Sequence, residues 1–378
     1  MTARPIVALD IGSTKVAAVA GLPHDEAPGG ELLGTSLITY PTLTDAWLGD
    51  PLMVGRAIEQ AVEALGLSRD VSEAYVAMSC PSLTSEQVHA DITLADEPIP
   101  VRGRDLERLA HCALSQALSI DREPLLLERL GCAGNGFEGI RDPRNLPTTR
   151  LRGTFHIVMM PTAVRRLVGQ AVGSAGLEIA QLTHTLPALL ASVENPALNQ
   201  QRALLVDVGG LTTDLGVMVG GVLHRSMFLS WGTLTCALAV AKELSVTLEQ
   251  ALRWVRQGME CHKPDVRLLL DRHWSTLREA IERLLKDQPR PDAALVGGRG
   301  GLIDGFVEWV EQTTGLPTQL CRSPRTSTVS DLARQVGVSA AIGLFELSVS
   351  HPSRGADRHA RFLNRLLDRT RTILTEYF

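Results

Sequence analysis

Several common features are absent from this 378-residue sequence, and each absence removes a class of protein. The cysteines form no CxxC pair, and the neighbours Cys261 and His262 have no second pair, so we expect reduced thiols rather than a disulfide framework or a zinc site. No apolar run approaches the ~20 residues that span a bilayer, and the N-terminus reaches Asp10 too early for a signal peptide. The net charge is -5 without any basic block, which predicts no nucleic-acid partner. After these exclusions, we expect a soluble or peripheral cytoplasmic protein.

The first informative stretch is a predicted β-hairpin near the N-terminus. Two apolar runs, residues 5–9 and 16–20, flank the polar turn Asp10-Ile-Gly-Ser-Thr-Lys15. The pattern returns almost two hundred residues later, where residues 203–206 and 215–219 flank Asp207-Val-Gly-Gly-Leu-Thr-Thr-Asp214. Each hairpin has an aspartate at the end of its first strand, then glycine, then hydroxyl residues. Two matched copies indicate an internal repeat and two related half-domains.

The chemistry of both turns suits a phosphate ligand. The glycines Gly12, Gly209 and Gly210 permit positive φ and a close backbone approach, and successive N–H groups in such a turn form an anion-binding concavity. Hydroxyl donors are supplied by Ser13, Thr14, Thr212 and Thr213. The carboxylates of Asp10 and Asp207 are candidate Mg²⁺ ligands, through waters because this cation dehydrates reluctantly. A single such turn is often only a turn, but a matched pair favours a phosphate site.

A third glycine-rich element lies at Gly297-Gly-Arg-Gly-Gly301, between an apolar strand-like run and an expected helix start that suits a polar or anionic ligand. It is not a dinucleotide-binding GxGxxG fingerprint, because Ile303 stands at the last glycine position, and the chain contains no GxxxxGK[ST] loop. These facts argue against a Rossmann fold and a P-loop fold.

In this order the three motifs resemble the two phosphate motifs and the adenosine motif of the actin, sugar-kinase and seventy-kilodalton heat-shock superfamily. Within it, residues 137–143 (FEGIRDP) and 150–158 (RLRGTFHIV) resemble the inserted subdomain of the FtsA family, actin-like proteins of bacterial cell division. The helix and turn at 171–177 resemble the segment that follows that subdomain. The resemblance extends in order over residues 5–347.

The resemblance implies ATP and Mg²⁺ as cofactors, with Asp10 and Asp207 at the metal. The implied nucleotide contacts are Asp10, Gly12, Ser13, Thr14, Lys15, Asp207, Gly209, Gly210, Thr212, Thr213, Gly232, Gly297, Gly298 and Gly300. It also implies self-association into filaments, binding of an FtsZ-type tubulin homologue, recruitment of other division proteins, and a peripheral position on the cytoplasmic face of the inner membrane at the division site.

Three departures from the family pattern weaken the expectation of a nucleotide pocket and of an FtsZ-binding surface. The family usually has a third glycine where this chain has Leu211, and a lysine where it has Trp254. A tryptophan there either stacks on adenine or packs against a neighbouring helix, and packing is favoured slightly. The segment 231–290 is shorter than the family's corresponding subdomain, which receives the FtsZ tail, and lacks its extra strand hairpin.

The sequence contains no identifiable kinase base. Hydrolysis needs a group that activates or orients water near the terminal phosphate. The best carboxylate near the second turn is Asp214, to which the resemblance gives a structural or metal-adjacent role. We therefore expect at most a slow ATPase in which nucleotide acts as a conformational switch.

The C-terminal segment reads as a linker at 348–356 followed by a basic amphipathic helix from His359 to Phe378. Such a helix can lie in the interface of an anionic membrane, and it resembles the family's membrane anchor. The alternative is a terminal helix docked on the protein or on a partner. The expected membrane contacts are Phe362, Leu363, Leu366, Leu367, Arg369, Ile373, Leu374 and Phe378. A second amphipathic run, 266–285, is expected to pack in the core.

We thus predict an α/β, actin/Hsp70-like (ribonuclease-H-like) duplicated fold. The first half comprises 1–82 and 161–196, with an FtsA-type insert at 83–160 that contains a helix near 101–118 and strands around 153–160. The second half comprises 197–231 and 290–347, with a small helical subdomain at 232–289. Two other functions stay open: a PilM-like adaptor of a pilus or secretion machine, and a small-molecule phosphotransferase or ATPase of the same superfamily.

Overall fold

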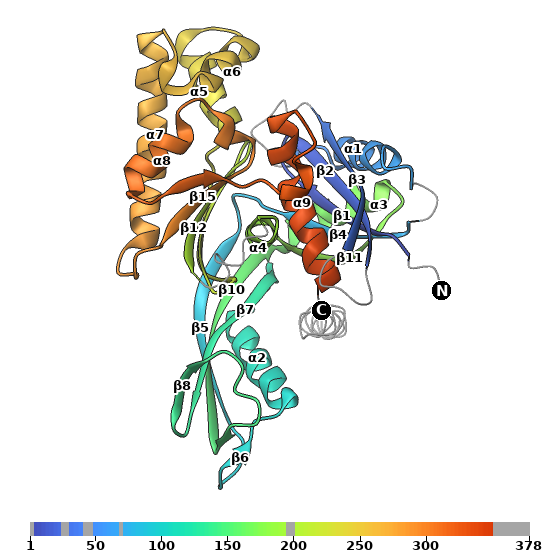
Figure 1. The fold of residues 1–378 in the computed structure, drawn as a ribbon, viewed down its shortest axis with the longest axis vertical. Coiled ribbons are helices and arrows are strands. Elements are labelled where there is room, and N and C mark those ends of the chain that lie inside the picture. Colours follow the sequence, from blue (N-terminus) through green and yellow to red (C-terminus); the bar gives the residue numbers. More distant parts are fainter. Residues whose placement is uncertain (1–3, 24–29, 41–47, 68–70, 194–200, 351–378) are drawn as a thin grey trace. The chain divides into compact units, whose positions relative to one another are not determined.

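The computed structural model describes residues 4–23, 30–40, 48–67, 71–193 and 201–350. The chain divides into two compact units (Figure 1). The smaller unit is Leu83–Arg165, and the larger unit contains the chain before it and the chain from Arg166 to Ser350. The predicted membrane-binding segment and most of its linker lie outside the described residues.

The N-terminal half of the larger unit is built on a five-stranded sheet in the order β11-β4-β1-β2-β3. Its antiparallel part is the hairpin β1 (Ile6–Ile11) and β2 (Lys15–Pro23) followed by β3 (Gly30–Thr39). Its parallel part adds β4 (Glu73–Met78) and β11 (Glu178–His184) beside β1. The run Val16–Ala20 is buried throughout, because helices cover both faces of the sheet: α1 (Pro51–Glu63) on one side and α9 (Leu332–Ser350) on the other.

The second sheet repeats this topology strand for strand, in the order β14-β13-β12-β15-β16. The hairpin β12 (Arg202–Val208) and β13 (Thr213–Val219) continues into antiparallel β14 (Val222–Leu229). The strands β15 (Ala293–Gly297) and β16 (Thr318–Leu320) run parallel to β12. The same two antiparallel and two parallel pairings in both sheets confirm the internal repeat that the hairpins predicted.

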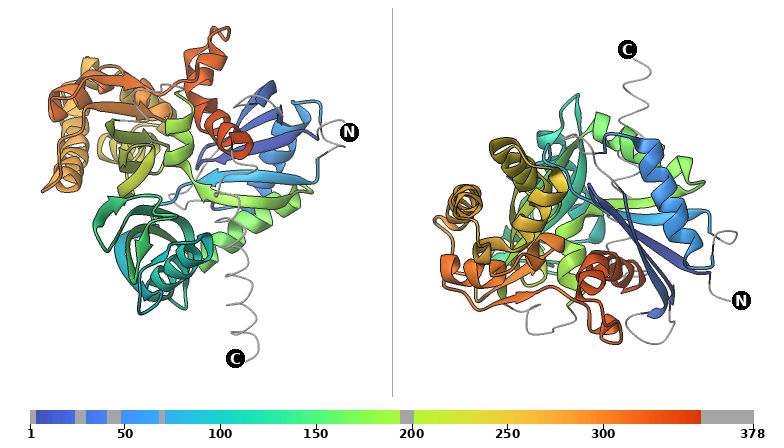
Figure 2. Two further views of the ribbon diagram at one scale, coloured as in Figure 1. Left: turned by 60° about the horizontal axis from the view of Figure 1, so that its bottom comes forward. Right: turned by 90° about the horizontal axis from the view of Figure 1, so that it is seen from above.

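The helix α9 packs against β1, β2, β3 and also against α4 (Thr185–Ala191) (Figure 2). It corrects two expectations. The linker was expected from 348, but the helix continues to Ser350. No apolar run was expected to be long enough to cross a membrane, yet Leu332–Val349 passes that test by length and composition, with a mean hydropathy of 1.3. Since 67% of this window is buried inside the protein, α9 is a core helix.

The region 232–289, all of it described, is helical and contains no strand. It consists of α5 (Thr233–Leu244), α6 (Leu248–Arg256), the short turn η1 (Gly258–Glu260) and α7 (Pro264–Leu285). The apolar face of α7 is buried, as expected, in the core shared with the second sheet. There Trp274 lies edge-on to Phe306 with ring centroids 5.3 Å apart. Another member of this core is Trp254, so the packing interpretation is confirmed.

The connection after β15 contains the short 3-10 turn η2 (Arg299–Leu302). The expected helix start at 302–306 is confirmed, because the α-helix α8 begins at Phe306 and ends at Thr314. A further 3-10 turn, η3 (Pro324–Thr326), precedes α9. The earlier helix α3 (Thr162–Ser174) follows the smaller unit.

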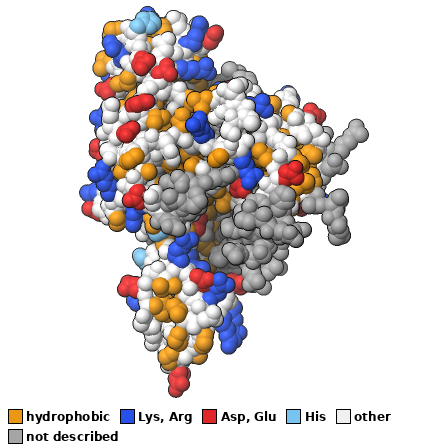
Figure 3. Space-filling view, in the orientation of Figure 1, with side chains coloured by type: hydrophobic (Ala, Val, Ile, Leu, Met, Phe, Trp, Pro, Cys, Tyr) orange, Lys and Arg blue, Asp and Glu red, His pale blue; other side chains and the backbone are white. Residues whose placement is uncertain are grey.

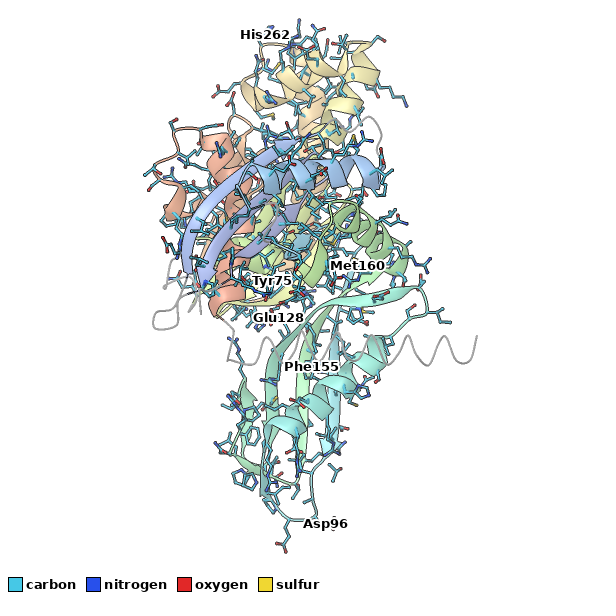
Figure 4. The ribbon with its side chains drawn as sticks, turned by 90° about the vertical axis from the view of Figure 1, so that its right-hand side faces the viewer. Tyr75, Asp96, Glu128, Phe155, Met160 and His262 are labelled. Atoms are coloured by element: carbon cyan, nitrogen blue, oxygen red, sulfur yellow. The ribbon has the colours of Figure 1, made fainter. Side chains whose placement is uncertain are left out.

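The smaller unit is a four-stranded antiparallel sheet, β5-β10-β7-β8, with one helix on it. Its strands are β5 (Thr84–Thr93), β7 (Arg122–Gly134), β8 (Phe137–Ile140) and β10 (Arg150–Pro161), and β6 (Ile99–Pro100) pairs with β9 (Pro147–Thr148). The helix α2 (Gly103–Ala117) covers the face on which Phe155 is fully buried (Figure 4). The expected helix near 101–118 and the strands around 153–160 are therefore present.

Candidate functional site

The two predicted phosphate turns have the same backbone form. The N–H of Gly12 donates to the Lys15 carbonyl at 3.0 Å, and the N–H of Gly209 donates to the Thr212 carbonyl at 2.8 Å. Each turn thus joins its two strands by a four-residue loop with a bond between its first and last residues. The strand register matches as well, because Asp10 lies opposite Ala17 and Asp207 lies opposite Asp214.

The glycines of these turns are not needed for positive φ. None of Gly12, Gly209 and Gly210 has a left-handed backbone, which corrects the expectation from the sequence. Gly210 is required for space instead: a Cβ there would lie 2.7 Å from Thr14 Cγ2 and 3.0 Å from Ser13 Oγ. Close approach of the two turns, rather than turn conformation, therefore explains this glycine.

The two turns contact each other directly. The buried N–H of Leu211 donates to Ser13 Oγ at 3.1 Å, and the Leu211 side chain is itself buried. Leu211 thus closes the cleft on the first turn through its backbone, and its side chain is packed away from solvent. The cleft between the two sheets is therefore closed where the two turns meet.

A small cavity of about 60 Å³ remains beside this contact. It is bordered by the ends of β1 and β12, both turns, the residue that follows β4, the start of α4, the β15–η2 connection and α9. Its described lining residues are Asp10, Ile11, Gly12, Ser13, Thr14, Lys15, Ser79, Thr185, Leu189, Asp207, Gly209, Gly210, Thr212, Gly298, Arg299, Val336 and Ala340. Most of the residues expected to contact phosphate are brought together here.

The two aspartates in this cavity have different electrostatic surroundings. Asp10 is almost buried and forms a 2.5 Å ion pair with Lys15, whose ammonium also donates to the Gly337 carbonyl of α9 at 2.6 Å. Among the described residues Asp207 has no such ion-pair partner: burial, and then the charges of Asp214 and Asp10, raise the pKa of its carboxyl to about 8. At neutral pH Asp10 is therefore neutralised by a cation and Asp207 mainly by a proton.

The carboxylate of Asp214 is fully buried and joins the two sheets. Ser79, which follows β4, donates to Asp214 Oδ1 at 2.6 Å, and His184 Nε2 lies 3.0 Å from Oδ2. The other ring nitrogen of His184 accepts the N–H of Leu186 at 3.3 Å, so the ring proton is on Nε2 and is donated to Asp214. Asp214 does not line the cavity, and this geometry gives it a structural role.

Apart from Gly298, the remaining predicted contacts lie around the cavity rather than in it. Gly298 lines it with a φ of 71°, and a Cβ there would meet the Val208 carbonyl at 2.2 Å. The other three glycines pack against protein atoms: Gly297 against Leu189, Gly300 against Val208, and Gly232 against the Gly210 carbonyl. Thr213 is buried and donates to the Trp231 carbonyl at 2.8 Å. In this closed form these residues support the turns.

Sequence reasoning missed three polar groups at the site. Ser79 and Thr185 follow the parallel strands β4 and β11, and a signal for them existed, since ligands of open α/β sheets bind at the carboxyl ends of such strands. Arg299 was inside a recognised motif, but only its glycines were assigned to the ligand. Its place in the cavity follows from the chain path between β15 and η2.

The chemistry that these residues support is phosphate binding with a water-retaining cation. Within the described residues, no group of three His, Cys, Asp or Glu side chains is arranged to hold a metal ion. Two carboxylates do not fill the coordination shell of Mg²⁺, so an ion at Asp10 and Asp207 would keep several waters.

On the face shown in Figure 3, acidic and basic side chains are interspersed over the described surface.

Comparisons with known proteins fit this geometry. No protein-family model matches the chain. It is 25% identical over 233 residues to the cell division protein FtsA of Escherichia coli K12, an alignment that covers 60% of this chain and 54% of the relative. The chain thus spans about half the length of this relative. It is 22% identical over 387 residues to FtsA of Pseudomonas aeruginosa PAO1, covering 93% of this chain and 90% of the relative.

Solved structures show the fold. The chain resembles a protein of the PilM-PilN type IV pilus biogenesis complex with a TM-score of 0.67 at 16% identity, covering 92% of this chain and 99% of that one. It resembles MreB5 of Spiroplasma citri bound to AMPPNP with a TM-score of 0.51 at 12% identity, covering 92% and 97%. The chain has the actin/Hsp70-like fold, and its sequence similarity to FtsA proteins is weak but recurs across several species.

Proposed function

We propose that the protein is an ATP-binding, actin-like scaffold of bacterial cell division, tethered to the membrane and self-assembling. The observation that carries the proposal is the pair of equivalent turns that face each other across one cleft, each with an aspartate at the end of its central strand. The similarity to FtsA over most of the chain supports the division role, and the nucleotide-bound MreB5 neighbour supports ATP as the ligand.

Nucleotide binding requires the cleft to open. The Ser13–Leu211 bond and the small cavity leave no room for a nucleoside between the turns. Mg·ATP would separate the turns, with the phosphates between them and the cation, still partly hydrated, near Asp10 and Asp207. ATP would then select the open form, so that nucleotide acts as a conformational switch.

Turnover is expected to be slow at most. The carboxylates among the described cavity residues are Asp10, which is ion-paired, and Asp207, which is largely protonated at neutral pH. Neither is a ready base for water. A phosphotransferase with ordinary enzymatic turnover, above roughly 1 s⁻¹, is therefore the less favoured function.

The tether, the filament and the partners belong to the same proposal. The basic amphipathic segment from His359 to Phe378 would bind anionic lipid on the cytoplasmic face of the inner membrane. The chain would associate head to tail and hold FtsZ-type filaments. The all-helical region 232–289 leaves the FtsZ contact the least supported part.

Electron microscopy on a lipid monolayer tests tail, nucleotide and assembly together. The full chain with Mg·ATP should form filaments on anionic lipid, whereas a chain that ends at Ser350 should not. Calorimetry with Mg·ATP in solution separates the parts: binding without filaments would reject the scaffold, and no binding by a folded chain would reject the nucleotide site. Equal sedimentation of both chains with liposomes would reject the tether.

A second candidate function is a PilM-like adaptor of a pilus machine. It is favoured by the high coverage of the PilM–PilN neighbour, 99% of that chain. Deletion of the gene in its own bacterium discriminates between the two: a division scaffold predicts elongated, unseparated cells, and a pilus adaptor predicts loss of pili with normal division.

A further inference from the structure

Tyr40 is the first residue after β3, and it holds the first phosphate turn from outside the cavity. Its hydroxyl donates a hydrogen bond to the Gly12 carbonyl, and its backbone N–H donates to the Thr14 carbonyl at 3.1 Å. A phenol keeps its proton at neutral pH, so this hydroxyl is available as a donor. The Tyr40 side chain is buried and is not part of the described cavity lining, whereas Gly12 and Thr14 are.

The hydroxyl bond fixes the direction of one peptide plane. The described backbone contains no cis peptide bond, and in a planar trans peptide the carbonyl and the next N–H point in opposite directions. The carbonyl of the Gly12–Ser13 peptide points at Tyr40, so the Ser13 N–H points away from Tyr40. Both Gly12 and Ser13 line the cavity and Tyr40 does not, which puts this N–H on the cavity side. An N–H presented by such a turn attracts an anion.

The second turn has an equivalent bond from a different source. Gly209 takes the place of Gly12, because Asp207 corresponds to Asp10. The Gly209 carbonyl accepts the backbone N–H of Thr233, at the start of α5, at 3.0 Å and the Thr233 hydroxyl at 3.4 Å. Thr233 also lies outside the described cavity lining. The same carbonyl is thus held from outside the cavity in both turns, by a helix backbone in one and by a side chain in the other.

We propose that Tyr40 is a positioning residue of the first phosphate turn, whose hydroxyl keeps the Ser13 N–H directed at a bound phosphate. The inference rests on the proposed function, because it assigns Tyr40 a role toward the nucleotide phosphates. Without the hydroxyl, the Gly12–Ser13 peptide can rotate and turn its carbonyl oxygen, which carries a partial negative charge, toward the cavity. Tyr40 therefore acts on the binding of phosphate groups and not on the binding of the nucleoside.

Calorimetry of the full chain with Mg·ATP tests this role. Tyr40→Phe deletes the hydroxyl and keeps the buried ring, and it should bind Mg·ATP about fivefold more weakly, the effect of one net hydrogen bond. Thr233→Val is the matched control. It deletes a hydroxyl on the equivalent carbonyl but leaves the backbone N–H bond in place, so its affinity should change less than about twofold.

A second measurement separates positioning from a general loosening of the fold. Tyr40→Phe should lose affinity for ATP and ADP but keep the wild-type affinity for adenosine, measured by ligand-observed NMR, which detects weak binding. A loosened fold would weaken all three ligands alike. Thermal unfolding without nucleotide checks that each variant is folded.

Three results would overturn the inference alone and leave the nucleotide function intact. They are equal Mg·ATP affinity of the wild type and a folded Tyr40→Phe, a loss for adenosine as large as the loss for ATP, and an equal loss of Mg·ATP affinity in Thr233→Val. If the folded wild type binds neither ATP nor ADP, the proposed nucleotide function fails, and this inference fails with it.

Discussion

The two phosphate turns share one backbone but differ in their charges. Lys15 in the first turn corresponds to Thr212 in the second, and Ala17 opposite Asp10 corresponds to Asp214 opposite Asp207. The first aspartate therefore has a cation beside it and a methyl group across from it, whereas the second has a hydroxyl and another carboxylate. Burial, together with this difference in neighbouring charges, raises the pKa of Asp207 to about 8, whereas Asp10 is held as an ion pair. The duplicated fold keeps its geometry, and the raised pKa of Asp207 makes the second turn the proton-sensitive one.

The largest effect is expected from Asp214→Ala, which makes the second hairpin resemble the first at this position. The substitution leaves Ser79 and His184 without their buried acceptor. Removing one partner of a buried charged network costs about 3–5 kcal/mol, so we expect a loss of that order in the free energy of unfolding, measured with urea. Asp214→Asn, which keeps an acceptor for Ser79, should lose less. A loss below about 1 kcal/mol for the alanine variant would contradict the joining role of this residue.

Lys15→Met removes the cation that distinguishes the first turn. It leaves the Asp10 carboxylate without its 2.5 Å partner and deprives Asp207 of the positive charge that lowers its pKa. We expect a loss of about 2–3 kcal/mol at pH 8, in the range for an unpaired buried charge, and a smaller loss at pH 5, where Asp207 is protonated with or without the cation. Lys15→Arg is the control that keeps the charge. A pH-independent loss would show that the aliphatic chain, not the ion pair, is what matters.

Asp207→Asn tests the second turn, and this substitution is expected to raise the free energy of unfolding rather than lower it. Because the pKa of Asp207 is raised in the folded state, the folded protein binds more protons than the unfolded chain between about pH 4 and pH 8. Wild-type stability should fall as the pH rises through that window. The asparagine variant lacks this titration and should be more stable than wild type at pH 8.5, by at least about 1.4 kcal/mol, the equivalent of one pKa unit, with the difference vanishing near pH 4. Thermal unfolding across this range is the measurement, and a constant difference would refute the pKa argument.

How far the sequence predicts this molecule depends on whether the relevant contact is local. The hairpins, the α2 helix and the α7 core face follow from turn residues and apolar spacing, and they are found where expected. The Ser79–Asp214 hydrogen bond joins residues 135 positions apart, and no periodicity in the sequence indicates such a pairing. The same holds for Leu211, whose effect on the cleft depends on Ser13 across it. The end of α9 was missed because Ser348 and Ser350 suggested a linker, whereas packing of α9 on the first sheet carries the helix to Ser350.

The smallest predicted effect compares the equivalent glycines Gly12 and Gly209. Neither has positive φ, so alanine is conformationally allowed at both and reduces the entropy of the unfolded chain, a gain of about 0.4–1 kcal/mol. A Cβ at Gly12 would meet Lys15 Cγ at 3.4 Å, an ordinary contact, but at Gly209 it would approach the Thr212 carbonyl at 3.2 Å. Gly12→Ala should therefore be neutral or slightly stabilising, and Gly209→Ala about 1 kcal/mol less favourable. Since the Thr212 carbonyl accepts the Gly209 N–H in the bond that closes the turn, it cannot move aside without weakening that bond. Equal unfolding temperatures for the two variants would mean that the second turn is as adaptable as the first, and the comparison would then rest on charge alone.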